Sequence, residues 1–256
     1  MSLHSLDILK SHEGQVDSKS VIKMFEPFMM EGRNARILEV IEHRSFSILP
    51  VVEGLYNMGN LAAVCRSADA MGFGAVHCIN TLQGEYKQSS RTSAGADKWI
   101  DLRVWDQGTT HALTFIKNAG YQLIVTHLSK DAVPIQAIDW TRPTAFVLGN
   151  EKMGVSAEAV TLADQCAMIP MAGFVESYNI SVAAALIMYE AQSQRVRKLG
   201  KNGDLTEDEK QKLQAFLMMR SVREGPTLLK EMLDRPPRFW QERGFKKAFQ
   251  QERASS

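Results

Sequence analysis

Three features that would assign the chain to a particular protein class are missing from its 256 residues. The three cysteines lie far apart, without the Cys or His spacing of a zinc site, so we expect neither a disulfide framework nor a bound metal. No apolar run approaches the ~20 residues that span a bilayer, and the first residues lack the basic start and apolar core of a secretory signal. We therefore expect a cytoplasmic protein with no membrane segment.

The chain also has almost no net charge, with 30 Lys plus Arg against 29 Asp plus Glu. A value near zero argues against a surface covered in nucleic-acid-binding charge. The total conceals an asymmetry, because residues 192–256 carry 15 basic and 9 acidic side chains, a net +6, against −5 for the remainder. The apolar fraction of 45% and the charged fraction of 23% are typical of a globular domain and exclude a disordered or collagen-like chain.

Apolar patterning predicts strands that alternate with helices. Strands are predicted for residues 47–53, 75–79, 121–126, 144–148 and 167–169. Helices are predicted for residues 18–43, 61–71, 111–118, 157–162, 181–197 and 206–219. This alternation indicates an α/β fold with a mostly parallel sheet and helices on both faces. Residues 198–204, with two glycines and an asparagine, form the best linker signal.

Three loops that follow predicted strands carry unusual residues, and ligands of parallel sheets bind beyond the carboxyl ends of the strands. The first loop, Asn57-Met-Gly-Asn60, leads into a helix that contains Arg66. The two polar side chains could flank one ligand site. From the residues alone, the simpler interpretation is that Asn60 caps the helix and that Arg66 pairs with Asp69 or Asp101.

The second loop, Gly149-Asn-Glu-Lys-Met-Gly-Val-Ser156, places two glycines around a charged pair directly after an apolar strand. Glycine lets the backbone approach a ligand closely, although a tight connection capped by Ser156 is the simpler interpretation. The loop lacks the Lys-Ser/Thr pair of a Walker motif, and no Gly-x-Gly-x-x-Gly fingerprint follows a strand. The spacing therefore supports a generic nucleoside site and argues against a nicotinamide-dependent oxidoreductase.

The third loop ends in Ser177-Tyr-Asn-Ile-Ser181 and runs into a helix rich in alanine. Hydroxyl, amide and free backbone donors gather there at a helix N-terminus, where the helix dipole favours negative charge. This polar capacity exceeds what capping requires. The small residues at 183–185 would let the helix approach another backbone closely, as in a tightly packed interior or a subunit interface.

Together and in this order, the three loops resemble the motifs of the SPOUT methyltransferases, specifically the SpoU/TrmH-type RNA 2'-O-ribose methyltransferases. The likeness covers about residues 31–197 and includes Arg33-Asn-Ala-Arg36, Thr92-Ser-Ala-Gly-Ala-Asp-Lys98-Trp99 and Glu190-Ala-Gln-Ser-Gln-Arg195. Within this family the chain is most similar to the tRNA guanosine-2'-O-methyltransferases, whose usual target is a D-loop guanosine. The resemblance implies S-adenosyl-L-methionine as cofactor, tRNA as partner, a C-terminal deep trefoil knot, and a homodimer whose active sites use both chains.

We accordingly expect three parts: an N-terminal helical RNA-binding segment (residues 1–45), a SPOUT methyltransferase domain (46–198) and a basic C-terminal helical extension (199–256). The extension matches the family poorly. Its positive charge and its aromatic residues suggest that this segment binds tRNA.

The resemblance also implies roles for particular residues. The implied catalytic residues are Arg66, Asn60, Glu151, Asn179 and Ser177. The implied cofactor contacts are Thr126, Gly149, Ile169, Met171, Tyr178 and Asn179. The implied RNA contacts are Arg33, Arg36, Arg44, Lys98 and Arg195. For any one of these cations, a solvated helix face remains the simpler interpretation.

Arg66 matches the arginine at the centre of the family's chemistry. A methyl group on a sulfonium is already activated, so the enzyme must hold it in line with a ribose 2'-oxygen and help remove that oxygen's proton. A guanidinium ordinarily keeps its proton, so a general-base role requires a special setting such as a nearby RNA phosphate. Donation of hydrogen bonds to the developing alkoxide and the adjacent phosphate is the other role, and the sequence leaves both open.

Two alternative functions remain. Methylation of rRNA would use the same chemistry, although no added N-terminal rRNA-binding domain is recognisable and the basic C-terminal part favours tRNA. A catalytically silent RNA-binding protein would keep the fold and lose the site. The presence of Arg66, Glu151 and Asn179 argues against this second alternative.

Overall fold

The computed structural model describes residues 17–55, 57–81, 99–129, 131–150 and 152–234. These residues form two compact units, which we describe separately. The first consists of residues 39–210, and the second of residues 17–38 and 211–234. This division falls at residues other than the boundaries expected after residues 45 and 198. The RNA-binding role of the two flanks stays a prediction.

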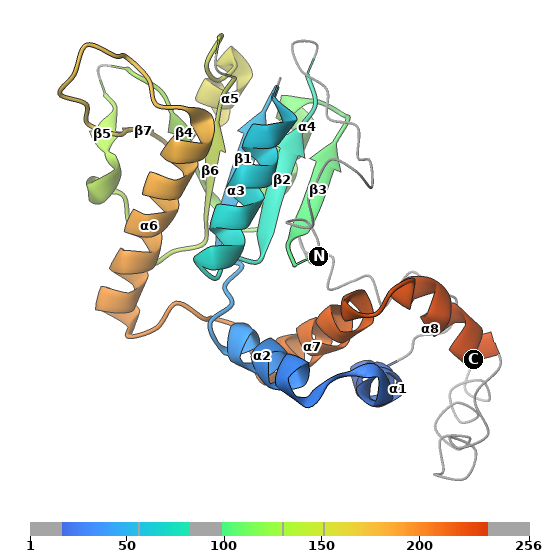
Figure 1. Ribbon diagram of the computed structural model, residues 1–256. Coiled ribbons are helices and arrows are strands. Elements are labelled where there is room, and N and C mark those ends of the chain that lie inside the picture. The colour runs from blue at the N-terminus through green and yellow to red at the C-terminus, as the bar shows by residue number, and fades with distance from the viewer. Residues whose placement is uncertain (1–16, 56, 82–98, 130, 151, 235–256) are drawn as a thin grey trace. The chain divides into compact units, whose positions relative to one another are not determined.

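A seven-stranded sheet forms the centre of the first unit (Figure 1). In spatial order the strands are β3 (Asp101–Trp105), β2 (Ala75–Ile79), β1 (Ile48–Glu53), β6 (Thr144–Leu148), β4 (Gln122–Thr126), β7 (Gln165–Met168) and β5 (Val133–Pro134). All six strand pairs of the described chain are parallel, and Val51 of β1 lies between His77 of β2 and Val147 of β6. The predicted α/β fold with a mostly parallel sheet is confirmed.

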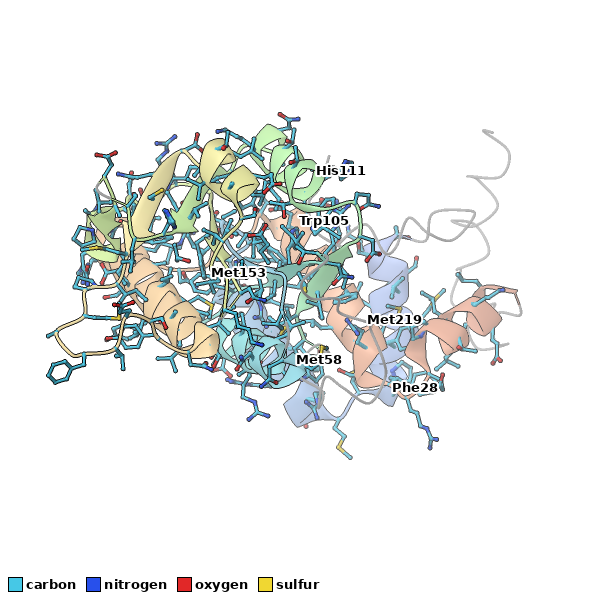
Figure 2. All side chains as sticks on the ribbon, turned by 90° about the horizontal axis from the view of Figure 1, so that it is seen from above. Phe28, Met58, Trp105, His111, Met153 and Met219 are labelled. Atoms are coloured by element: carbon cyan, nitrogen blue, oxygen red, sulfur yellow. The ribbon has the colours of Figure 1, made fainter. Side chains whose placement is uncertain are left out.

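Helices cover both faces of this sheet. On one face α3 (Met58–Ala70) packs beside α6 (Ile180–Leu199), and on the other α4 (Thr109–Asn118) packs beside α5 (Ala157–Leu162). The view from above shows the sheet between these two layers (Figure 2). Every residue of β1, β2 and β6 is buried, which explains why these strands appear in the sequence as continuous apolar runs.

Two strands of the first unit were missed in the sequence. Strand β3 lies at the edge of the sheet, is half-buried for most of its length and carries Asp101 and Arg103, so it shows no apolar run. Strand β5 has only two residues and is followed by a short 3-10 helix, η4 (Ile135–Ala137). Segments of this kind contain too few apolar positions for a pattern to stand out.

The second unit is helical and includes α1 (Ser18–Phe25), η2 (Glu26–Phe28) and α8 (Gly225–Asp234), together with parts of α2 (Glu31–Glu42) and α7 (Glu207–Ser221). The segment predicted to be helical over residues 18–43 is helical but interrupted, because Pro27 cannot continue an α-helix and η2 separates α1 from α2. Helix α8 was not predicted; Pro226 lies in its first turn, where no backbone donor is needed. Thr206 and Glu209 form a capping box at the start of α7 through reciprocal hydrogen bonds.

The predicted linker at residues 198–204 is fixed to the chain that enters β1. The carboxylate of Asp204 accepts hydrogen bonds from the Ser45 hydroxyl at 2.6 Å and from the backbone N–H groups of Phe46 and Ser47, each at 3.3 Å. It also pairs with the buried guanidinium of Arg195 at 3.0 Å. The connection after α6 therefore holds the amino end of the central strand in place.

The three cysteines are free thiols. Cys65 and Cys78 are buried, and Cys166 is half-buried. Burial raises the pKa of the Cys78 thiol to about 12, which keeps it in the unreactive protonated form. No helix within the described residues has the length and apolar character needed to cross a membrane.

Candidate active site

A cavity of about 470 Å³ lies at the carboxyl ends of β4, β6 and β7. Its described lining consists of residues 126–128, 148–150, 154–155, 167–169, 171, 176–180 and 183. The volume falls within the range of small-molecule and cofactor sites, about 300–1,000 Å³. The position also matches the rule for parallel sheets, whose ligands bind beyond the carboxyl ends of the strands.

All the residues that the resemblance implied as cofactor contacts line this cavity. They are Thr126, Gly149, Ile169, Met171, Tyr178 and Asn179, and Ser177 of the catalytic set lies among them. They come from two strand ends and two loops that are far apart in the sequence. The fold therefore brings one predicted group of residues together at one site.

The second loop closes on itself through paired backbone hydrogen bonds. Asn150 N–H donates to the carbonyl of Gly154 at 3.0 Å, and Gly154 N–H donates back at 2.8 Å. A Cβ on Gly149 would lie 2.1 Å from the carbonyl carbon of Gly154 and from the nitrogen of Val155. Residue 149 must therefore be glycine because the chain folds back over it, a reason different from the ligand approach that the sequence suggested.

Asn150 fixes this loop to the end of β1. Its side-chain oxygen accepts hydrogen bonds from the backbone N–H groups of Lys152 and Met153, at 2.8 and 3.2 Å, and its side-chain nitrogen donates to the carbonyl of Gly54 at 2.6 Å. Ser156 caps α5, as expected, by accepting a hydrogen bond from the backbone of Ala159. Glu151, predicted to be catalytic, lies outside the described residues.

The first and third loops meet through two asparagines. The side-chain nitrogen of Asn179 donates to the side-chain oxygen of Asn60 at 3.3 Å, while its oxygen caps α6 by accepting from the backbone and hydroxyl of Ser181. The suggestion that Asn60 caps its helix is wrong, since Asn57 caps α3 through the backbone of Gly59 at 2.8 Å. Asn60 instead extends from the first turn of α3 towards the loop that lines the cavity.

Arg66 lies on the same helix as Asn60, six residues further on, about 9 Å along the helix axis. Its side chain is exposed and is not part of the cavity lining. Of the two partners offered by the simpler interpretation, Asp69 is bound by Arg44 at 2.8 Å instead, and the pairing of Arg66 with Asp101 stays a prediction. The structure thus places Arg66 on the surface of the helix that carries Asn60.

The residues predicted to contact RNA fall into two groups. Arg33 and Arg36 are exposed on α2, and Lys98 lies outside the described residues. Arg44 is 1% exposed and donates to the carbonyl of Phe73 and to Asp69, while Arg195 is 2% exposed and pairs with Asp204. A guanidinium that is buried and already paired cannot reach a phosphate without breaking that pair, so a direct RNA contact is wrong for these two arginines.

Several lining residues were not predicted, among them His127, Met168, Glu176 and Ala183. Each is close in sequence to a predicted residue. Apolar periodicity shows which side of a regular element is buried, but it does not show which side chains of an irregular loop face a cavity. The sequence therefore located the loops and only part of the lining.

Comparison with known proteins agrees with this geometry. The model of the SpoU rRNA Methylase family matches residues 47–189. The chain is similar to the Escherichia coli tRNA (guanosine(18)-2'-O)-methyltransferase, with 39% identity over 188 residues that make up 72% of this chain and 81% of the relative.

Two solved structures are also similar. One is the A. aeolicus TrmH/SpoU tRNA modifying enzyme, with a TM-score of 0.67, 34% identity, and coverage of 75% of this chain and 98% of that one. The other is the SpoU methyltransferase AviRb from Streptomyces viridochromogenes in complex with AdoMet, with a TM-score of 0.52, 29% identity, and coverage of 62% and 65%. The family match spans more than half of the residues, and the fold, the cavity and the relatives agree with it: the chain belongs to the SpoU rRNA Methylase family.

Proposed function

We propose that this protein transfers a methyl group from S-adenosyl-L-methionine to the 2'-oxygen of a guanosine ribose in the D-loop of tRNA. The observation that carries the proposal is the gathering of all six implied cofactor contacts around one cavity at the carboxyl edge of the sheet. The relative from Escherichia coli acts on guanosine 18 of tRNA, as its name states, and this position is the expected target here.

The chemical character of the cavity fits this cofactor. Aliphatic side chains, including Leu148, Val155 and Ile169, provide surface for an adenine ring, and hydroxyl and amide groups lie beside them. The carboxylate of Glu176 provides negative charge for a ligand with a positive sulfonium and ammonium group. The AviRb structure shows that a protein of this fold binds AdoMet.

The chain's own residues perform positioning and charge stabilisation. When bound, S-adenosyl-L-methionine supplies an activated methyl group. Asn179 and Ser177 orient the ribose or the cofactor, while Asn60 and Glu151 orient the loops and Arg66. Arg66 donates hydrogen bonds to the alkoxide that develops at the 2'-oxygen and to the adjacent phosphate, where a fixed cation stabilises the transition state more than the ground state. The proton of the 2'-hydroxyl leaves to water with the help of that RNA phosphate.

The proposed active form is a homodimer in which each copy supplies residues to the active site of the other. Helix α6 is apolar on two sides: Ala184, Ile187 and Met188 face the core, whereas Leu186 and Tyr189 are exposed. With Val182 they follow i, i+4, i+7 spacing and form one stripe. A stripe of this kind on a core helix fits burial against another copy. Arg66, which does not line the cavity of its own chain, then acts at the cavity of the partner copy.

The deep trefoil knot implied by the resemblance belongs to the same proposal.

Replacing Leu186 and Tyr189 together by glutamate is expected to convert the dimer into a monomer, because two charges would be buried without partners. Light scattering at micromolar concentration measures the mass. Thr114→Glu, on the exposed side of α4, is the matched control and is expected to leave the dimer intact. A wild-type protein that is monomeric at that concentration contradicts this part of the proposal.

The basic C-terminal part increases the affinity for tRNA. Residues 235–256, which lie outside the described residues, contain six Lys plus Arg and two Glu, a net +4. Truncation after Asp234 is expected to weaken tRNA binding and to reduce the salt dependence of log K by about 0.9 for each phosphate that the protein no longer neutralises. Cofactor affinity should not change. An unchanged salt slope, measured by filter binding, would show that this segment does not contact RNA. Truncation after Lys198 is avoided because it would remove Asp204, which pairs with Arg195.

Incubation of the purified protein with labelled S-adenosyl-L-methionine and unmodified tRNA or rRNA tests the substrate class. We expect label in tRNA and none in rRNA. Label confined to rRNA would favour the alternative target, and label in neither would favour the silent RNA-binding protein. The cytoplasmic location stays a prediction.

A further inference from the structure

Glu53, the last residue of β1, carries a buried carboxylate held by two donors. Its side chain is 3% exposed. One carboxylate oxygen accepts a short hydrogen bond from the hydroxyl of Thr109, the first residue of α4. The other accepts from the backbone N–H of Ser156 at 2.8 Å. A carboxylate at the end of the central strand therefore links the starts of two helices on one face of the sheet.

Ser156 directly follows the second loop, which forms one wall of the cavity through Gly149, Asn150, Gly154 and Val155. The start of this loop is held by the pairing of Leu148 with Val52 of β1. Its middle is held by the hydrogen bond from Asn150 to Gly54, and its end by the hydrogen bond from Ser156 to Glu53. The carboxyl end of β1 thus holds the wall at three successive points.

We infer that Glu53 is a positioning residue for the cofactor cavity, which acts by fixing the end of the second loop through the backbone of Ser156. This inference rests on the proposed function only for the identity of the ligand. Without the carboxylate, the partly buried Ser156 N–H and the buried Thr109 hydroxyl would lose their acceptor, and the loop would shift to regain hydrogen bonds. A cavity wall displaced by a fraction of an ångström binds its ligand less well.

Asp204, in the segment after α6, offers a matched control because it binds the other end of the same strand. Its carboxylate accepts backbone N–H groups at the amino end of β1, as Glu53 does at the carboxyl end, but it lies at the edge opposite the cavity. Loss of either carboxylate should destabilise the fold. Only loss of the Glu53 carboxylate should change the cavity.

The test measures the dissociation constant of S-adenosyl-L-methionine by titration calorimetry for the full-length wild type, Glu53→Ala and Asp204→Ala. We expect an increase of about 10-fold for Glu53→Ala and of less than about 2-fold for Asp204→Ala, whatever the relative losses in Tm. In tRNA methylation, Glu53→Ala should raise KM for the cofactor. A purely structural defect would instead lower the amount of active enzyme and so lower the apparent kcat at constant KM.

Conservative variants keep the test decisive if Glu53→Ala does not fold. Glu53→Gln retains one acceptor for Ser156, and the Thr109 hydroxyl can turn to accept from its amide, so affinity should stay within about 3-fold of wild type. Thr109→Val removes only the hydroxyl that orients the carboxylate and should weaken binding by about 3-fold or more. Asp204→Asn is the control for both.

Equal affinities for Glu53→Ala and Asp204→Ala, or for Thr109→Val and Asp204→Asn, would overturn the inference. A wild-type protein that fails to bind S-adenosyl-L-methionine would instead overturn the proposed function, so the two failures are distinguishable.

Discussion

Arg66→Ala is expected to reduce methyl transfer to tRNA by about 100-fold to 1,000-fold, the cost of removing one preorganised donor to a developing oxyanion. Arg66 is exposed and lies outside the cavity lining, so its loss should leave both the Tm and the affinity for S-adenosyl-L-methionine near the wild-type values. Single-turnover methylation with saturating cofactor and tRNA measures the chemical step.

The control for Arg66→Ala is Arg142→Ala. Arg142 is also exposed, but it precedes β6 and so lies at the amino ends of the strands, away from the cavity. It should retain nearly full activity. Arg66→Lys keeps the charge but loses the planar fork of donors, and it should recover only part of the activity. Full activity of Arg66→Ala would contradict the role assigned to this residue.

Gly149→Ala is expected to weaken cofactor binding by about 100-fold or more. The added Cβ would lie 2.1 Å from two backbone atoms of residues 154 and 155, and backbone cannot move aside as a flexible side chain can. The loop must shift, and the residues that shift are those that line the cavity. Calorimetric titration with S-adenosyl-L-methionine measures the loss.

Gly173→Ala is the matched control for Gly149→Ala. It lies in the third loop, and a Cβ placed there meets no atom within 4 Å. Its affinity should stay within about 2-fold of wild type. Normal cofactor binding by Gly149→Ala would show that the loop around residues 149–155 does not form the wall of the cofactor site.

The parts of the fold that the sequence predicted well are those with continuous apolar runs. Strands β2 and β6 lie at the predicted residues, because burial on both sides of a parallel sheet favours a largely apolar segment. Strand β3 gave no such signal, since its edge position leaves room for Asp101 and Arg103. The break at Pro27 was visible in the sequence but was overridden by the apolar stripe on either side of it.

The residues of the candidate site likewise include some that the sequence predicted and others that it did not. The loops were located correctly because their polar residues are unusual after apolar strands, and the resemblance then selected the residues that line the cavity. Arg44 and Arg195 were misjudged because a sequence does not reveal that an arginine is buried beside an aspartate far along the chain, as Arg44 is beside Asp69. Glu53 was passed over because a carboxylate at the end of an apolar strand looks like the start of a solvated loop.

The central claim is that the acceptor is the ribose 2'-oxygen of one guanosine in tRNA. The most direct measurement compares methyl transfer to two otherwise identical tRNAs, one with guanosine and one with 2'-deoxyguanosine at position 18, the position named for the Escherichia coli relative. The account predicts one methyl group per molecule on the first tRNA and none on the second. Equal transfer to both tRNAs would contradict it.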